Sequence, residues 1–145
     1  MARTYRLGPA RKALNTVVTA MLRAGIGARS TYLLTTTGAR TGRPRTTPVV
    51  LVESDAGRWL VSPYGDVGWV HNVRATPRIS LRRGNIVQVA EAREVDAETA
   101  GPILQQYLRQ AGVTAPFFDA RDDAPPQVFV EEAGRHPVFA LQRSA

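Results

Sequence analysis

Hydrophobic and polar positions follow two different periods along the chain. Between Leu14 and Leu22 the apolar residues recur at helical spacing, after Pro9 and before Gly25, which predicts an amphipathic helix. From Thr31 onward the pattern changes to short runs of β-branched and aromatic residues, separated by turns rich in Gly, Pro and Asp. These runs predict about six strands, over residues 32–37, 45–53, 58–62, 79–82, 86–93 and 138–141.

Further helices are expected late in the chain. One begins after Asp96, a typical N-cap residue, and another begins at Pro125–Pro126 and ends at Gly134. Because the strands are not separated by regular helices, a doubly wound parallel sheet is disfavoured. The pattern predicts a mainly β fold with helices (α+β), a small antiparallel barrel with helices at the front and after the fifth strand. We expect one domain over residues 1–145, in which residues 1–29 form the basic amphipathic helix and its linker.

The charge is concentrated at the front of the chain. The formal net charge is +7, and residues 1–45 hold nine basic side chains and no Asp or Glu. Such a segment indicates an anionic partner: a phosphate-bearing ligand, an acidic lipid surface or a nucleic acid. A basic amphipathic helix can lie on an anionic membrane, and the plainer interpretation is a helix packed on the domain with solvated arginines. Nucleic acid is disfavoured, because the sequence offers no recognition helix or aromatic strand platform.

The composition excludes several kinds of chemistry. The chain has no Cys, which rules out disulfides, thiolate metal sites and a cysteine nucleophile. Its two histidines, His71 and His136, are too few for a histidine-rich metal cage, so no metal site is expected. No targeting or membrane-spanning segment is recognised, which favours the cytoplasm, with the basic helix as a peripheral contact to the inner face of the membrane. No catalytic triad can be assembled, so an enzyme would depend on a bound cofactor.

The densest group of polar residues lies between Thr35 and Pro48. It combines two glycines, three arginines and several hydroxyls between two expected strands. Glycines let backbone N–H groups approach an anion closely, and arginines add charge-assisted hydrogen bonds. The segment is not a P-loop, because it lacks Gly-Lys-Ser/Thr and a following helix. A phosphate site and a solvated basic turn are both open interpretations.

A second group lies between Ser62 and Arg74, where a strand passes through a glycine-containing loop into a short helix. Trp69 and Asn72 are one helical turn apart, so an aromatic plane and an amide can face one site. Loop N–H groups and a helix N-terminus suit a polar ring or a phosphate. Core packing of Trp69 and a surface or capping role for His71 are the alternatives.

Together these two segments resemble the deazaflavin-dependent nitroreductase and quinone reductase family of actinobacteria. The matching patterns are Thr-Thr-Gly-x-Arg-Thr-Gly-x-Pro-Arg-x-x-Pro, Ser-Pro-Tyr-Gly and Trp-x-x-Asn-x-Arg, and the resemblance covers roughly Thr31 to Ala92. It implies a split β-barrel related to flavin mononucleotide oxidases and reductases, with coenzyme F420 as the cofactor. Flavin mononucleotide is the less favoured occupant, and the oligomeric state stays open between monomer and homodimer.

The resemblance assigns coenzyme-binding roles to individual residues. The positions that match the hold on the phosphate and polyglutamate tail are Arg40, Arg45, Thr46, Thr47 and Pro48. The positions that match the loop against the deazaflavin ring are Ser62, Pro63, Tyr64 and Gly65. The element that closes over the coenzyme is matched by Trp69 and Asn72.

The implied activity is hydride transfer from reduced F420 to a small electron-poor acceptor: a quinone, an activated enone or a nitro compound. Tyr64 is the candidate catalytic residue, since it is a phenol inside a motif that can protonate the product; solvent is the other donor. Phe117 and Phe118 stand where nitroimidazole-reducing members carry tyrosines, so that activity is not expected. Together with the apolar residues of the first helix, both are expected to wall the substrate side. Ala39 replaces a basic residue found in many members. The alternative function is a carrier that holds a deazaflavin, a flavin or a lipid without turnover.

Overall fold

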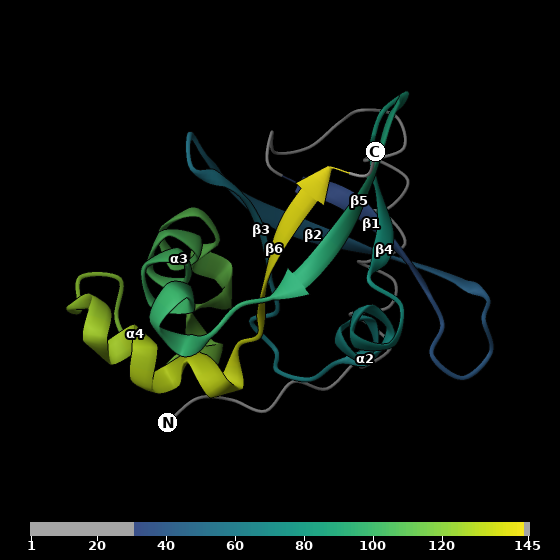
Figure 1. Cartoon of the computed structure of the whole chain (residues 1–145). Coiled ribbons are helices and arrows are strands. Elements are labelled where there is room, and N and C mark those ends of the chain that lie inside the picture. The colour runs from purple at the N-terminus through teal and green to yellow at the C-terminus, as the bar shows by residue number, and fades with distance from the viewer. Residues whose placement is uncertain (1–30, 144–145) are drawn as a thin grey trace.

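Six strands form a closed antiparallel barrel in the computed structural model, which describes residues 31–143 (Figure 1). Around the barrel the strands follow the order β1-β2-β3-β6-β5-β4, and β4 pairs with β1 to close it. Their bounds are β1 Thr31–Thr37, β2 Pro44–Ser54, β3 Gly57–Val61, β4 Arg78–Arg83, β5 Ile86–Glu94 and β6 Val138–Arg143. The predicted mainly β fold, with helices after the fifth strand, is confirmed. The predicted N-terminal helix, and any membrane contact through it, falls outside the described residues.

Helical segments accompany the barrel on two sides. Their bounds within residues 31–143 are α2 Gly68–Ala75, α3 Ala97–Gln110, η1 Gly112–Phe117, α4 Pro126–Glu132 and η2 Ala133–Arg135, where η marks a 3-10 helix. The helices α3 and α4 pack together against one side of the barrel, and α2 lies apart from them (Figure 1). The helix predicted to end at Gly134 instead ends at Glu132 and continues as the 3-10 turn η2. No helix in the described range is long and apolar enough to cross a membrane.

Alternating side chains on β2, β3 and β6 separate two hydrophobic cores. On β2, Val49 and Leu51 point into the barrel, whereas Val52 packs in the second core between the strands and the helices. The same alternation puts Phe139 of β6 inside the barrel and its neighbour Val138 on the helical side. A slip of one residue would exchange the two sets, so the two buried faces fix the register of these strands.

Two features of the sequence stabilise the helical layer: a cap at the start of α3 and a glycine where α3 meets α4. The side chain of Asp96 accepts a hydrogen bond from the Thr99 N–H at 2.8 Å, which caps the start of α3 as the sequence predicted. Midway along α3, a Cβ atom on Gly101 would lie 2.5 Å from Cγ2 of Val130 in α4. Glycine at this position therefore permits the close approach of α3 and α4.

Candidate functional site

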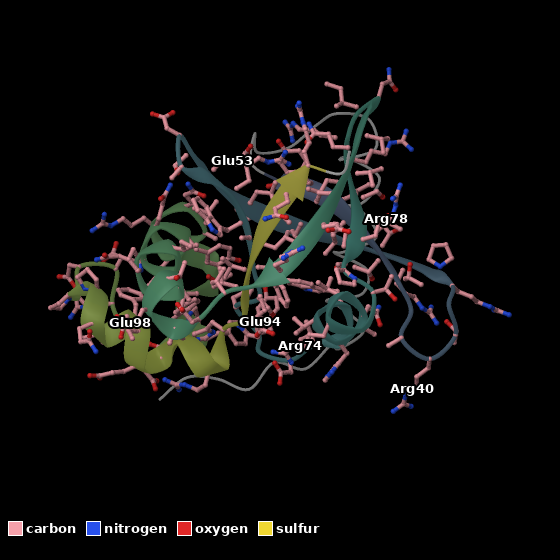
Figure 2. All side chains as sticks on the ribbon, viewed as in Figure 1. Arg40, Glu53, Arg74, Arg78, Glu94 and Glu98 are labelled. Atoms are coloured by element: carbon pink, nitrogen blue, oxygen red, sulfur yellow. The ribbon has the colours of Figure 1, made fainter. Side chains whose placement is uncertain are left out.

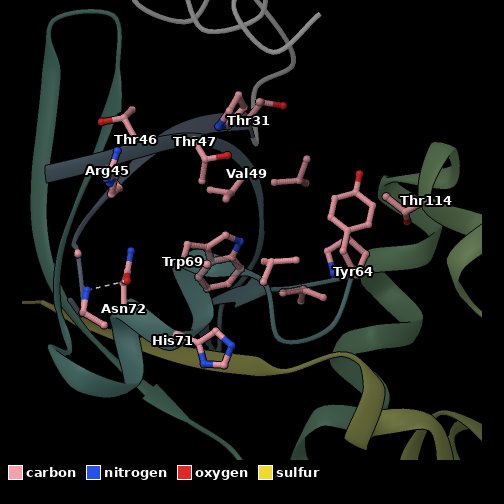
Figure 3. Close-up of a pocket in the computed structure, with 18 of the residues that line it drawn as sticks. Thr31, Arg45, Thr46, Thr47, Val49, Tyr64, Trp69, His71, Asn72 and Thr114 are labelled. Carbon is pink, nitrogen blue, oxygen red and sulfur yellow. Dashed lines mark hydrogen bonds between the residues drawn. The ribbon is translucent and has the colours of Figure 1, made fainter. Parts of the chain in front are cut away.

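A pocket of about 1140 Å³ opens where the β1–β2 loop, β2, the β3–α2 loop, α2 and the end of α3 meet (Figure 3). Nine of the eleven residues predicted to bind a coenzyme line it. These are Arg40, Arg45, Thr46, Thr47, Pro48, Pro63, Tyr64, Trp69 and Asn72. Two segments that lie apart in the sequence thus form one site, with Arg45 and Thr46 at one end and Tyr64 at the other (Figure 3).

The β1–β2 loop is a tight turn that depends on its glycines. The Gly38 N–H donates to the Arg43 carbonyl at 2.8 Å, and the Gly42 N–H donates to the Gly38 carbonyl at 2.9 Å. Gly42 has a φ of +69°, which side-chain-bearing residues rarely adopt. A Cβ atom on Gly38 would lie 2.8 Å from Oγ1 of Thr41 and 3.1 Å from the Arg43 carbonyl. Both glycines therefore serve the turn itself.

The arginines of this loop are available to a ligand. Arg40 extends from the loop away from the barrel (Figure 2), and Arg45 lies exposed at the start of β2. Among residues 31–143, no acidic side chain forms an ion pair with Arg40 or Arg45. Guanidinium groups without an internal partner, next to threonine hydroxyls, form a set of donors suited to phosphate or carboxylate oxygens.

Asn72 fastens the β1–β2 loop to α2. Its Oδ1 accepts a hydrogen bond from the Ala39 N–H at 2.9 Å (Figure 3), and its Nδ2 donates to Oγ1 of Thr36 at 3.1 Å. Two residues further along the helix, Arg74 makes two hydrogen bonds of 2.8 Å to the Glu94 carboxylate of β5 (Figure 2). Helix α2 is thereby fixed to the barrel and to the loop, so the side chain of Asn72 positions the charged end of the pocket.

The other end of the pocket is aromatic and apolar. This apolar part begins at Trp69, in the middle of the pocket (Figure 3), whose ring centroid lies 5.7 Å from that of Phe139 in the barrel core. Tyr64 is half-buried, and its ring makes an edge contact with the ring of Phe117, with the two centroids 4.8 Å apart. A planar ligand ring entering here would contact the Trp69 face, because indole and tyrosine rings offer large, rigid apolar surfaces.

Ser62 and Gly65, two of the predicted ring-contacting residues, do not line the pocket. Ser62 is fully buried, and its hydroxyl donates to the Gly65 carbonyl at 2.6 Å. Gly65 itself has a φ of +86°. These two residues close the turn that presents Pro63 and Tyr64 to the pocket.

Tyr107 and Thr114 line the pocket, and neither was predicted as a site residue. Tyr107 is 3% exposed, and burial together with the nearby Tyr64 raises the pKa of its phenol well above the usual range. Its phenol hydrogen-bonds to Thr114, whose own hydroxyl donates to the Ala111 carbonyl at 2.7 Å. The Tyr107 phenol therefore stays protonated and engaged within the protein. Its place in the apolar stripe of α3 made it indistinguishable from a core residue in the sequence.

The expectation that Phe117 and Phe118 wall the substrate side is wrong, and the first helix, the other part of that expected wall, falls outside the described residues. Neither side chain lines the pocket, and Phe118 is buried in the helical core with its ring stacked at 3.9 Å on His136. The aliphatic lining comes instead from Val49, Val50, Val61, Val67 and Ala111. Apart from that of Val67, their strand and helix positions gave no motif by which the sequence could single them out. His71 lies exposed at the edge of the pocket, as expected for a surface histidine.

The donor set fits an anionic, ring-bearing coenzyme better than a metal ion. Within residues 31–143 no cluster of three or more His, Cys, Asp or Glu side chains could hold a metal. The pocket instead joins Arg40 and Arg45, which have no acidic partner in the described part of the chain, to the aromatic rings of Trp69 and Tyr64. A molecule with a negatively charged tail and a flat ring would satisfy both ends.

The sequence profile of the family described as "F420H(2)-dependent quinone reductase" matches residues 11–133. The chain belongs to this family. The family predicted from the two motifs is thus confirmed.

Two curated relatives are each 40% identical to this chain over 62 residues. They are a putative F420H(2)-dependent quinone reductase of Mycobacterium bovis and an F420H(2)-dependent quinone reductase of Mycobacterium tuberculosis. That segment is 40% of this chain and 42% of either relative, so the match spans less than half of their length.

Solved structures share the fold at low sequence identity. A structure described as an F420-H2 dependent reductase has a TM-score of 0.54 at 24% identity, covering 79% of this chain and 95% of that one. The heme storage protein HutZ of Vibrio cholerae gives 0.57 at 17% identity, with 97% and 92% covered. A putative pyridoxamine 5'-phosphate oxidase of Listeria innocua gives 0.53 at 13%, with 91% and 94% covered. These likenesses establish the barrel architecture.

Proposed function

We propose that this protein is an oxidoreductase that transfers a hydride from reduced coenzyme F420 to a quinone. The observation that carries the proposal is the pocket with two chemically different ends, Arg40 and Arg45 at one and Tyr64 and Trp69 at the other. Membership of the F420H(2)-dependent quinone reductase family supports the choice of coenzyme and acceptor. Enones and nitro compounds are the further acceptors to be tested, since they too are electron-poor and can accept a hydride.

The residues present would hold the coenzyme along the length of the pocket. Arg40, Arg45 and the Thr46 and Thr47 side of β2 would bind the phosphate and carboxylates of its tail through charge-assisted hydrogen bonds. Trp69 and the Pro63–Tyr64 turn would contact the ring and exclude water from its reacting face. When bound and reduced, F420 supplies the hydride.

Tyr64 would protonate the reduced acceptor. Reduction of a quinone to a hydroquinone takes one hydride and one proton, and the proton would pass from Oη of Tyr64 to an acceptor oxygen, with solvent restoring the phenol. Tyr64 is half-buried at the pocket surface, whereas the phenol of Tyr107 is engaged with Thr114 and buried. Of these two phenols, Tyr64 is the one placed to meet a substrate.

The first experiment is a fluorescence titration of the purified protein with oxidised F420 and, in parallel, with flavin mononucleotide. We expect micromolar or tighter binding of F420 and weaker binding of the flavin. Anaerobic mixing with reduced F420 and a soluble quinone then follows coenzyme oxidation by absorbance. Preference for flavin would overturn the coenzyme assignment. Tight F420 binding without oxidation by quinone, enone or nitro compounds would support the carrier function, in which the coenzyme is held without turnover.

A further inference from the structure

A buried histidine–glutamate pair lies directly behind the loop that carries Tyr64. His136 is 2% exposed and Glu132, on α4, is 3% exposed. Nε2 of His136 lies 2.8 Å from Oε1 of Glu132, and Nδ1 of the same ring lies 2.9 Å from the Pro63 carbonyl oxygen. Neither side chain lines the pocket, and no role in the coenzyme site described above uses either of them.

The hydrogen bonds around the pair determine its protonation. The Pro63 carbonyl can only accept, so Nδ1 of His136 carries a proton. The Glu132 carboxyl accepts from the Asp119 N–H at 2.7 Å and from the Ala120 N–H at 2.8 Å, one bond to each oxygen. Two backbone N–H donors to one carboxyl group favour its carboxylate form. A carboxylate oxygen facing Nε2 requires a second ring proton, so the geometry describes an imidazolium–carboxylate pair.

The other charged and aromatic groups packed around the pair are Arg135, Asp119 and Phe118. Arg135, on η2, places Nη2 3.5 Å from Oε1 of Glu132, and its Nη1 is neutralised by the Asp119 carboxylate at 2.8 Å. Phe118 stacks on the His136 ring with the centroids 3.9 Å apart and the planes at 17°. An aromatic face next to a cationic ring is favourable. A charged pair buried this deeply is costly unless each partner is fully hydrogen-bonded, and here each is.

The pair is part of a clamp on the turn formed by residues 62–65. The Ser62 N–H donates to the Pro137 carbonyl at 2.9 Å, one residue along the chain from His136. On the far side of the turn, Gly65 lies against the Arg135 carbonyl, which is 3.6 Å from where a Cβ would sit. The backbone of residues 135–137 therefore follows the turn along its length, and the His136 side chain makes the central contact, to the residue just before Tyr64.

We propose that His136, held as an imidazolium by Glu132, is a positioning residue that fixes the Pro63 carbonyl and through it the placement of Tyr64 in the pocket. The effect on turnover rests on the proposed function, whereas the charge state and the contact with Pro63 do not. The helical layer, through α4 and the segment that follows it, thus supports the catalytic end of the site.

The charge state is tested on the ligand-free protein by long-range proton–nitrogen NMR of the histidine rings. At neutral pH we expect both ring nitrogens of His136 to carry protons in slow exchange with solvent. The exposed ring of His71 serves as the internal reference, and a His136→Gln variant assigns the signals. A neutral His136 ring with one protonated nitrogen would overturn the ion pair. This measurement needs no coenzyme, so failure to bind F420 would defeat the proposed function and leave this result standing.

The positioning role is tested with Glu132→Gln, measured well below its melting temperature. Its matched control is Glu131→Gln, which removes the same charge from the neighbouring exposed residue. We expect Glu132→Gln to lower kcat about tenfold, because small misplacements of a catalytic group are costly, while the Kd for F420 changes less. In a Tyr64→Phe background the same substitution should leave kcat unchanged, since the group it positions is gone. An equal loss of kcat in both backgrounds would overturn the role. Should Glu132→Gln fail to fold, the NMR result on the unmodified protein still decides the pair.

Discussion

Replacing Asn72 by Ala should loosen the charged end of the pocket while leaving the barrel folded. The substitution removes two hydrogen bonds, from the Ala39 N–H at 2.9 Å and to Oγ1 of Thr36 at 3.1 Å. Thr36 is 2% exposed, so its hydroxyl loses a partner that water cannot easily replace, whereas Ala39 is exposed and its N–H can be solvated. At about 1 kcal/mol for each net bond, the free energy of unfolding should fall by about 1–2 kcal/mol.

The same substitution should weaken coenzyme binding, because the loop that carries Arg40 is no longer tied to α2. Ordering that loop on binding would then cost part of the roughly 1.5–3 kcal/mol that one charge-assisted hydrogen bond contributes, which corresponds to about a tenfold rise in the Kd for F420. Asn85→Ala, at the exposed β4–β5 turn, removes the same kind of side chain far from the loop and serves as the control.

Asn72→Asp separates anchoring from charge. Aspartate keeps the oxygen that accepts from Ala39, and the Thr36 hydroxyl can donate to its second oxygen, so thermal stability should be close to that of the unmodified protein. It also adds a negative charge beside the predicted phosphate position, so affinity should fall and should recover as salt is added. Thermal unfolding and F420 titrations at two salt concentrations measure both quantities. If Asn72→Ala kept both its melting temperature and its affinity, Asn72 would not be the anchor of this loop.

Three further substitutions test the other parts of the site and fold. Arg45→Ala should weaken F420 binding by roughly 1.5–3 kcal/mol, and an unchanged titration would remove Arg45 from the site. Tyr64→Phe should lower kcat far more than it changes the coenzyme Kd; equal turnover would exclude the phenol as the proton donor. Gly101→Ala should lower the melting temperature, because the added Cβ meets Val130 at 2.5 Å, and overpacking costs about 1–3 kcal/mol against about 1 kcal/mol of helix propensity regained.

The parts of the site that could be predicted from the sequence are those built from local chemistry. A turn that needs Gly38 and Gly42 and carries two arginines is recognisable within a dozen residues. Trp69 and Asn72 are also close in sequence, and their helical spacing alone puts them on one side of α2. The bounds of the first five strands differ from those predicted by at most one residue at either end, because Gly, Pro or Asp follows closely after each of them. The last strand, β6, runs two residues further than predicted, since no such residue follows it.

The parts that could not be predicted depend on contacts between distant segments. Tyr107 has the spacing of a core residue in α3, and only the approach of that helix to β2 and β3 brings its ring to the pocket. Thr114 lies in a 3-10 helix, whose short length leaves no periodic pattern to recognise. His136 contacts Pro63 across 73 positions of sequence, and nothing near either residue marks that contact; only its pairing with Glu132, four residues earlier, is local.

The helical layer therefore does more than cover one side of the barrel. Its core reaches the pocket at Tyr107, and the His136–Glu132 pair at its edge holds the Pro63–Tyr64 turn. The barrel core reaches the pocket through Val49 and through the contact of Phe139 with Trp69. Substitutions in the helical core should thus affect the catalytic end first. The charged end depends on the β1–β2 loop and α2, which are tied to each other by Asn72 rather than to α3 or α4. We therefore expect substitutions in the β1–β2 loop and α2 to change mainly the Kd for the coenzyme, and substitutions in the helical layer to change mainly kcat.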